Sequence, residues 1–193
     1  MSLATGFADP VLGAQVAFRC LLEAIAHPGR VVPTATGLAP PAPLLAPAYA
    51  AALSLLDFET PVWLDDSLAT AAVRDTLRLH CGCPIVTEPH KASFALLAAG
   101  ARTPLEAFAA GTPEYPDRAA TLIWQVSELA AEDGVVLTGP GIRTSARLHV
   151  AGLPADFWVQ WGTNHGRYPL GVDVVFVTAD RIAALPRSVE VRS

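Results

Sequence analysis

The stretch Pro169-Leu170-Gly171-Val172-Asp173-Val174-Val175-Phe176-Val177 decides the fold. After Gly171 it is apolar except for Asp173, and a continuous apolar run of this kind is typical of a central strand that is covered on both faces. Segments with helical periodicity alternate with strands along the rest of the chain. This alternation predicts an α/β fold in which a mixed sheet is sandwiched by helices.

The other expected elements follow from periodicity and from flanking residues. Asp9 and Pro10 predict the start of a first helix, because Asp caps helices and Pro suits their first position, and Pro28-Gly29 predicts its end. Further helices are expected at 47–56, from a cap at Asp65 or Asp66 to Gly82, at 103–110 and from Pro154 onward. Strands are expected at 61–64, 85–87, 93–97, 121–126, 135–137, 147–150 and 172–177, and an extended proline-rich passage at 31–45.

The composition excludes several classes of protein. With 193 residues, 52% of them hydrophobic and 16% charged, the chain predicts one domain spanning 1–193. A net charge of -5 argues against nucleic acid as a partner, because phosphate binding needs a basic face. No apolar run approaches the roughly 20 residues of a membrane helix, and the start Met1-Ser2-Leu3-Ala4 does not look like a secretory leader. With three cysteines, which cannot all pair, these features predict a cytoplasmic protein.

A single lysine restricts the chemistry. Lys91 follows His90 rather than a glycine, so it does not complete a Walker A loop. It is also the only residue that could form a Schiff base with pyridoxal phosphate, and it lies in a polar, turn-like stretch. The sequence therefore predicts that the protein binds no pyridoxal phosphate.

Two short motifs allow both a functional and a structural interpretation. His80-Cys81-Gly82-Cys83 could offer zinc ligands, but a C-x-C pair without a second ligand pair equally fits the end of a helix with two small thiols, and no metal is expected. Gly139-Pro140-Gly141-Ile142 could cradle a phosphate, but it lacks the third glycine of the dinucleotide fingerprint and suits a tight turn between strands. Asp173 is a third case, because a half-buried carboxylate needs a hydrogen-bond partner whether its role is structural or functional.

The order of several longer motifs resembles the PhnH family, a subunit of the bacterial carbon–phosphorus lyase machinery. The motifs cover nearly the whole chain: Phe18-Arg19 with His27-Pro28-Gly29; Asp57-x-Glu59-Thr60-Pro61-Val62-Trp63-Leu64; Leu77-Arg78-Leu79-His80 before Pro84; Gly111-Thr112-x-Glu114-Tyr115-Pro116-Asp117; and Pro169-Leu170-Gly171-Val172-Asp173 with Leu185-Pro186-Arg187.

The resemblance implies several properties that the composition does not. It implies a fold similar to the large domain of pyridoxal-phosphate-dependent transferases, without the cofactor. It implies a homodimer that joins the other core subunits of the lyase. That assembly forms an alkylphosphonate ribose 5-triphosphate from ATP and an alkylphosphonate, with release of adenine, so any activity of this chain is expected only within a multi-subunit transferase.

No catalytic residue comes with the resemblance. Five of the matched polar residues are candidates for substrate binding: Arg19, Arg78, His80, Asp173 and Arg187. Two interpretations stay open. In the first, arginines of this chain bind phosphate oxygens in a site shared with other subunits; in the second, the chain is a non-catalytic scaffold that holds the complex together.

Overall fold

The apolar run ending at Val177 forms strand β8 (Asp173–Val177), in the interior of a seven-stranded sheet. The computed structural model describes residues 4–192; residues 1–3, on which part of the expectation about a leader rests, and residue 193 lie outside the described residues. Strand β5 (Thr121–Gln125) pairs with β8 in parallel, and β9 (Arg181–Leu185) pairs with it antiparallel. Residues of β8 from Val174 onward are buried, as the apolar run predicts.

The seven strands lie in the order β1-β9-β8-β5-β4-β2-β3. All pairs from β8 to β3 are parallel, whereas β9 and β1 pair antiparallel, so the predicted mixed sheet is confirmed. The remaining strands of this sheet are β1 (Val32–Pro33), β2 (Val62–Leu64), β3 (Ile85–Val86) and β4 (Phe94–Leu97). Three single turns of 3₁₀ helix are η1 (Pro89–Lys91), η2 (Leu105–Ala107) and η3 (Pro116–Arg118).

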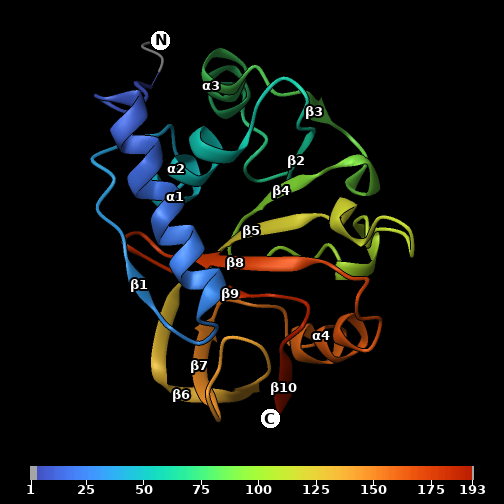
Figure 1. Cartoon of the computed structure of the whole chain (residues 1–193). Helices are drawn as coiled ribbons and strands as arrows, with labels where there is room; N and C mark the ends of the chain where they lie inside the picture. Colours follow the sequence, from blue (N-terminus) through green and yellow to red (C-terminus); the bar gives the residue numbers. More distant parts are fainter. Residues whose placement is uncertain (1–3, 193) are drawn as a thin grey trace.

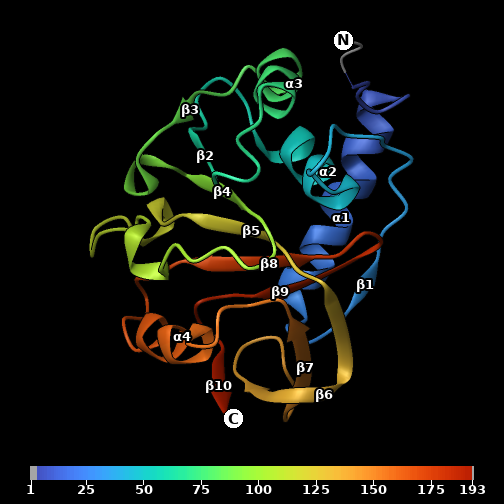
Figure 2. The same cartoon turned by 180° about the vertical axis from the view of Figure 1, so that it is seen from behind.

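Different layers cover the two faces of the sheet (Figures 1 and 2). One face packs against three helices: α1 (Pro10–Ala26), α2 (Ala46–Leu55) and α3 (Ala71–Cys81). The other face packs against α4 (Phe157–His165) and a three-stranded antiparallel sheet of β6 (Glu128–Thr138), β7 (Ala146–Ala151) and β10 (Glu190–Arg192). Helices therefore lie on both faces, as expected, but on the second face α4 shares the covering layer with the small sheet, because leucines of β6 and β7 fill that core alongside the aromatic side chains of α4.

The ends of α1 follow the sequence signals, whereas α3 and α4 begin later than predicted, α4 at Phe157 rather than at Pro154. Asp9 caps α1 by accepting hydrogen bonds from the backbone N–H groups of Val11 and Leu12 at 3.0 Å each. Helix α3 begins later than predicted, because Thr70 is its cap, whereas Asp65 bonds Ser67 in a preceding turn. The expected helix at 103–110 is only the single turn η2.

Among the helices of residues 4–192, none is both long and apolar enough to cross a membrane.

Candidate functional site

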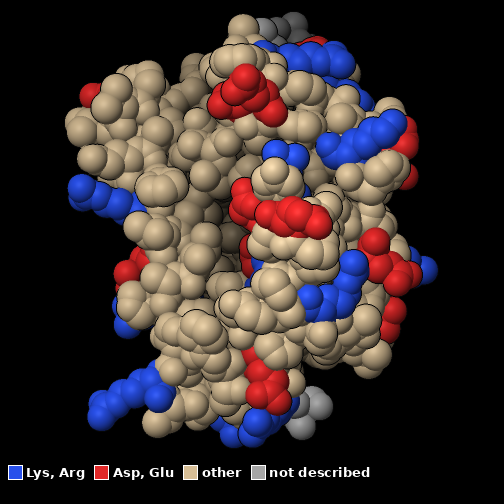
Figure 3. Space-filling view, turned by 45° about the vertical axis from the view of Figure 1, so that its right-hand side comes forward, with Lys and Arg blue, Asp and Glu red and all other residues tan. Residues whose placement is uncertain are grey.

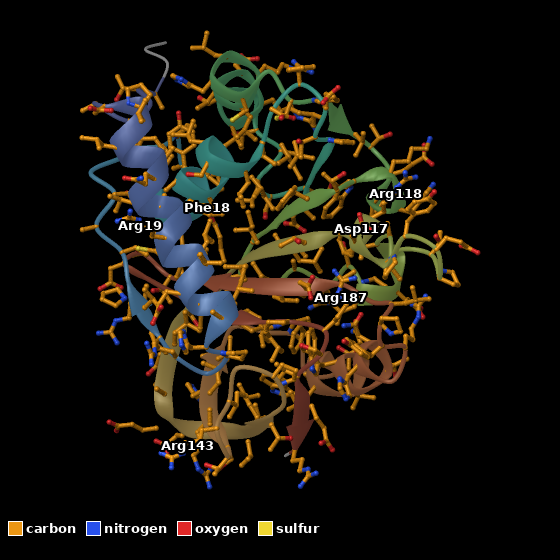
Figure 4. The ribbon with its side chains drawn as sticks, viewed as in Figure 1. Phe18, Arg19, Asp117, Arg118, Arg143 and Arg187 are labelled. Atoms are coloured by element: carbon orange, nitrogen blue, oxygen red, sulfur yellow. The ribbon has the colours of Figure 1, made fainter. Side chains whose placement is uncertain are left out.

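The five candidate binding residues lie in three separate places. Arg19 lies on the outside of α1, and Arg78 and His80 lie in the last turn of α3. Only Asp173 and Arg187 touch each other. Figure 4 shows Arg19 beside α1 at the left edge and Arg187 right of the middle, away from α1. The predicted residues of one chain therefore do not form one binding site.

Asp173 and Arg187 meet because β8 and β9 are antiparallel neighbours. Val174 pairs with Leu185, which places the start of β8 beside the residues that follow β9. The Asp173 carboxylate accepts the backbone N–H of Arg187 at 2.7 Å and the guanidinium Nε–H at 3.1 Å. The Arg187 side chain is 14% exposed and that of Asp173 is 29% exposed. The expected partner of the Asp173 carboxylate is thus an arginine together with its own backbone amide.

The same guanidinium fixes the neighbouring loop. Its Nη1 donates to the carbonyl oxygen of Pro116 at 2.7 Å, and the carbonyl of Arg187 lies 3.0 Å from Nδ1 of His165. An open groove of about 320 Å³ lies here, lined in part by Asp117 and Tyr168. Figure 3 shows acidic and basic side chains beside a hollow on this side of the molecule. The Asp173 carboxylate neutralises the Arg187 guanidinium, and the carbonyl of Pro116 occupies one of the N–H donors of that guanidinium. The ion pair is therefore a structural clamp that holds the loop at Pro116, rather than a free anion-binding site.

The end of α3 is held by contacts within the chain. Nε2 of His80 lies 2.8 Å from the carbonyl oxygen of Ala4, and Arg78 approaches Asp75 only at 4.0 Å. Gly82 ends the helix in a left-handed conformation, as its position predicts. A hydrogen bond with Cys83 and burial raise the pKa of the Cys81 thiol, and the same bond lowers the pKa of Cys83. Within residues 4–192, no three His, Cys, Asp or Glu side chains gather as a metal site requires.

The structure brings together basic residues that the sequence analysis did not connect. An open cavity of about 600 Å³ is lined by His27 and Arg30 after α1 and by Arg143 and Arg147 around the β6–β7 turn. Glu23 pairs with Arg30 and lies 3.4 Å from Nδ1 of His27. Arg143, at the bottom of Figure 4, and Arg147 form no ion pair with any carboxylate of residues 4–192. The sequence signal for this cavity was a pair of glycine motifs, His27-Pro28-Gly29 and Gly139-Pro140-Gly141, whose proximity only the fold reveals.

Those glycines permit the close approach that builds the cavity. Gly29 and Gly141 have φ angles of +89° and +82°, which side chains rarely adopt. A Cβ at Gly141 would lie 2.3 Å from the carbonyl oxygen of Ala26, and one at Gly29 would lie 2.6 Å from Cβ of Ala146. The turn therefore also has the structural role that the sequence suggested, since it joins β6 to β7 and packs against the end of α1.

Comparison of the sequence with known proteins identifies its family. The profile of the family described as "Bacterial phosphonate metabolism protein (PhnH)" matches residues 5–192. This chain belongs to the PhnH family. A PhnH relative from Rhizobium meliloti (strain 1021), named as a subunit of alpha-D-ribose 1-methylphosphonate 5-triphosphate synthase, is 37% identical over 183 residues, covering 94% of this chain and 92% of its own. The HtxG protein of Stutzerimonas stutzeri, named as a candidate C-P lyase subunit, is 34% identical over 179 residues, covering 92% and 85%.

Two of the motifs that suggested the PhnH family, those at Asp57 and Gly111, stabilise turns. Asp57 accepts hydrogen bonds from the Thr60 hydroxyl at 2.6 Å and the Glu59 N–H at 3.0 Å, in the turn that leads into β2. These bonds lower the pKa of the Asp57 carboxyl. In the turn after Gly111, backbone N–H groups of Thr112 and Tyr115 bond each other's carbonyl oxygens. In these two motifs the polar residues and backbone amides thus stabilise turns.

Lys91 lies in a polar, turn-like stretch, as the sequence predicts. It is exposed in η1, and its ammonium group contacts the Glu88 carboxylate at 2.5 Å. That ion pair lowers the pKa of Glu88. The exposed position does not provide the desolvation that lowers a lysine pKa for Schiff-base chemistry.

Proposed function

We propose that this chain is a subunit of a carbon–phosphorus lyase assembly in organophosphonate catabolism. Within that assembly it takes part in forming an alkylphosphonate ribose 5-triphosphate from ATP and an alkylphosphonate, with release of adenine. The family and the names of both relatives support this assignment. We further propose that the chain is cytoplasmic, that it works as a homodimer beside the other core subunits, and that it is related in fold to the large domain of pyridoxal-phosphate-dependent transferases without using that cofactor.

The observation that carries the proposal is the separation of the candidate residues. Arg19 lies on α1, Arg78 in the last turn of α3 and Arg187 after β9, where it is already bound by Asp173. A complete site therefore needs residues from other chains, which favours a role as an architectural subunit over a self-contained enzyme.

The experiment is to reconstitute the core assembly with and without this chain. Adenine release from ATP in the presence of methylphosphonate is the readout, and co-purification of the remaining subunits reports assembly. We expect adenine release to be lost when this chain is left out. Full adenine release and intact assembly without this chain would contradict the proposal.

A second candidate role is direct contact with phosphate oxygens at the cavity beside the β6–β7 turn. It is favoured by the arginines Arg143 and Arg147, which lack carboxylate partners among the described residues and face the same cavity as Arg30. Charge-assisted hydrogen bonds contribute about 1.5–3 kcal/mol each. Arg143→Ala with Arg147→Ala should therefore raise the KM for ATP of the complete assembly by roughly 10-fold or more.

Exposed Arg102, which forms no ion pair within residues 4–192, provides the matched control. Arg102→Ala should leave the KM for ATP unchanged. An unchanged KM in the Arg143 and Arg147 double variant, in an assembly that still forms, would leave the scaffold role as the only candidate of the two.

A further inference from the structure

A polar cavity of about 230 Å³ lies between α4 and the turn η2. Helix α4 and α1 are on opposite faces of the seven-stranded sheet (Figures 1 and 2), so this cavity is remote from α1. One wall is η2, and the other wall is a single side of α4 and its two ends. The residues of the second wall recur at helical spacing: Asp156, Gln160, Thr163, Asn164 and Arg167.

Hydrogen bonds hold both walls of the cavity in place. Oε1 of Gln160 accepts the backbone N–H of Leu105 at 2.9 Å, which ties η2 to the middle of α4. Nε2 of Gln160 donates to the Asp156 carboxylate, also at 2.9 Å. The Asn164 side chain bonds the backbone N–H and carbonyl of Val172 at 2.8 and 2.9 Å. The two amide side chains are thus used in structural contacts, and the walls are formed before any ligand binds.

Three charged side chains line this cavity without pairing with one another. Within residues 4–192, Glu106 and Arg167 form no ion pair and no side-chain hydrogen bond, and the Asp156 side chain bonds only Gln160. An ionised carboxylate accepts several hydrogen bonds, and a guanidinium donates five. The cavity therefore has acceptors and donors of full charge that are left for a ligand.

The two signs of charge lie at different ends of the cavity. Asp156 is the N-cap of α4, and Arg167 lies two residues after the last residue of this helix. The two residues are eleven positions apart, which corresponds to roughly 16 Å along a helix axis. Each also has the sign of charge that the helix dipole favours at its end. Glu106 follows Leu105, whose bond to Gln160 places this carboxylate nearer to Asp156 than an extended turn would.

We propose that this cavity binds a small zwitterion, with an ammonium group at Glu106 and Asp156 and a phosphonate or carboxylate group at Arg167. An ammonium group has three N–H donors, which two carboxylates can share. The planar guanidinium fork of arginine matches an oxyanion bidentately. The choice of the anion rests on the proposed function: in a phosphonate assembly the ligand is an aminoalkylphosphonate, whereas its carboxylate counterpart is an amino acid.

The size of the cavity favours a small molecule over a peptide segment. A cavity of about 150 Å³ holds benzene, so 230 Å³ holds roughly nine non-hydrogen atoms. Pockets for larger, drug-sized ligands have volumes of about 300–1,000 Å³. A short aminoalkylphosphonate fits this volume, and its carbon chain keeps the ammonium and phosphonate groups apart, as the separated charges of the cavity require.

The first test is calorimetric titration of the full chain with three probes: 2-aminoethylphosphonate, ethylphosphonate and β-alanine. Ethylphosphonate lacks the ammonium group, so 2-aminoethylphosphonate should bind at least tenfold more tightly. Because a phosphonate carries more negative charge than a carboxylate, it should also bind more tightly than β-alanine. Tighter binding of β-alanine would overturn the phosphonate and assign the cavity to an amino acid. Equal affinity for 2-aminoethylphosphonate and ethylphosphonate would overturn the ammonium site.

The second test compares matched substitutions inside and outside the cavity. Arg167→Ala and Glu106→Gln should each raise the Kd for 2-aminoethylphosphonate at least tenfold. Arg102→Ala and Glu114→Gln remove the same charges from exposed residues that do not line this cavity, and they should leave the Kd unchanged. Circular dichroism checks that all four variants are folded. Equal effects of the cavity variants and their controls would overturn the proposed site.

The outcomes of these tests are independent of the test of the proposed function. A folded chain that binds none of the three probes would overturn the cavity as a binding site. It would not affect the proposed function, whose readout is adenine release with methylphosphonate, a compound without an ammonium group. Conversely, full adenine release by an assembly without this chain would contradict the proposed function, while charge-dependent binding of 2-aminoethylphosphonate would still support the zwitterion site.

Discussion

Asp173 is the residue at which the sequence and the structure agree in most detail. Its carboxylate accepts hydrogen bonds from the backbone N–H and the guanidinium of Arg187. The guanidinium in turn donates a hydrogen bond to the carbonyl oxygen of Pro116. Asp173→Ala leaves a guanidinium and an amide without their acceptor, which costs about 1–3 kcal/mol or more for charged groups. For a chain of this size we expect the melting temperature to fall by roughly 2–12 °C. Thermal unfolding followed by circular dichroism measures the change.

Asp117 in the same groove is the control for this prediction. It is exposed, and its carboxylate makes no hydrogen bond or ion pair within the described part of the chain. Asp117→Ala should change the stability by less than about 0.5 kcal/mol. Wild-type stability in Asp173→Ala would contradict the clamp, and normal stability with loss of adenine release would make Asp173 a residue of the shared site instead.

For Tyr49, unlike Asp173, we expect that removing a polar group does not lower the melting temperature. Its side chain is fully buried, and its hydroxyl has no hydrogen-bond partner within residues 4–192. Since an unsatisfied buried hydroxyl costs free energy, Tyr49→Phe should keep or raise the melting temperature. Tyr168→Phe, at a residue 60% exposed, should change nothing. A loss of more than about 1 kcal/mol in Tyr49→Phe would show that the hydroxyl has a partner.

The pH dependence of Tyr49 has a defined sign. Burial, with a smaller contribution from Cys81, raises the pKa of its phenol from 10.0 to about 12. The unfolded chain therefore ionises this group first, and stability is lost as the pH rises from 10 towards 12. Tyr49→Phe should lack this part of the alkaline loss, which denaturant titrations across that pH range can measure.

At the scale of elements, the junction between α1 and the β6–β7 turn depends on one close approach. Gly141 has a positive φ and no room for a side chain, whereas Gly37 has a φ of +62° and a Cβ there would meet no atom within 4 Å. Gly37→Ala should cost about 1 kcal/mol, for the backbone conformation alone. Gly141→Ala should cost at least about 2 kcal/mol more, because the Ala26 carbonyl must move. Denaturant unfolding of both variants measures the difference, and equal losses of stability would contradict the close approach.

Element β9 shows what the sequence pattern did not reveal. Its residues Arg181-Ile182-Ala183-Ala184-Leu185 contain two alanines and carry little strand propensity. They form a strand because β8 supplies an open edge and the turn at residues 178–181 returns the chain to it. The consequence reaches the candidate site, since β9 is the element that delivers Arg187 to Asp173.

For the whole molecule, the dimer predicts a melting temperature that depends on protein concentration. If folding and association are coupled, mass action stabilises the dimer as the concentration rises. We expect an increase of about 2 °C for each tenfold increase in concentration of the wild-type chain. A melting temperature of the wild type that is independent of concentration would contradict a dimer coupled to folding.

The sequence by itself determined the local elements and the family. The apolar run of β8, the cap at Asp9 and the left-handed glycine at Gly82 depend on residues close in the chain, whose preferences act without the rest of the fold. The motifs of the PhnH family could likewise be read in order, because each is a short run of residues that are close in the chain.

Only the tertiary structure decided which residues meet and which faces stay open. Arg187 lies 14 residues after Asp173, yet the two side chains form a hydrogen bond. Arg143 follows Arg30 by more than a hundred residues, yet both line the same cavity. The periodicity of α1 predicted a helix but not that Leu21 and Ala24 would be its buried residues. The physical reason is that desolvation and packing depend on neighbours from distant parts of the chain, which no local pattern contains.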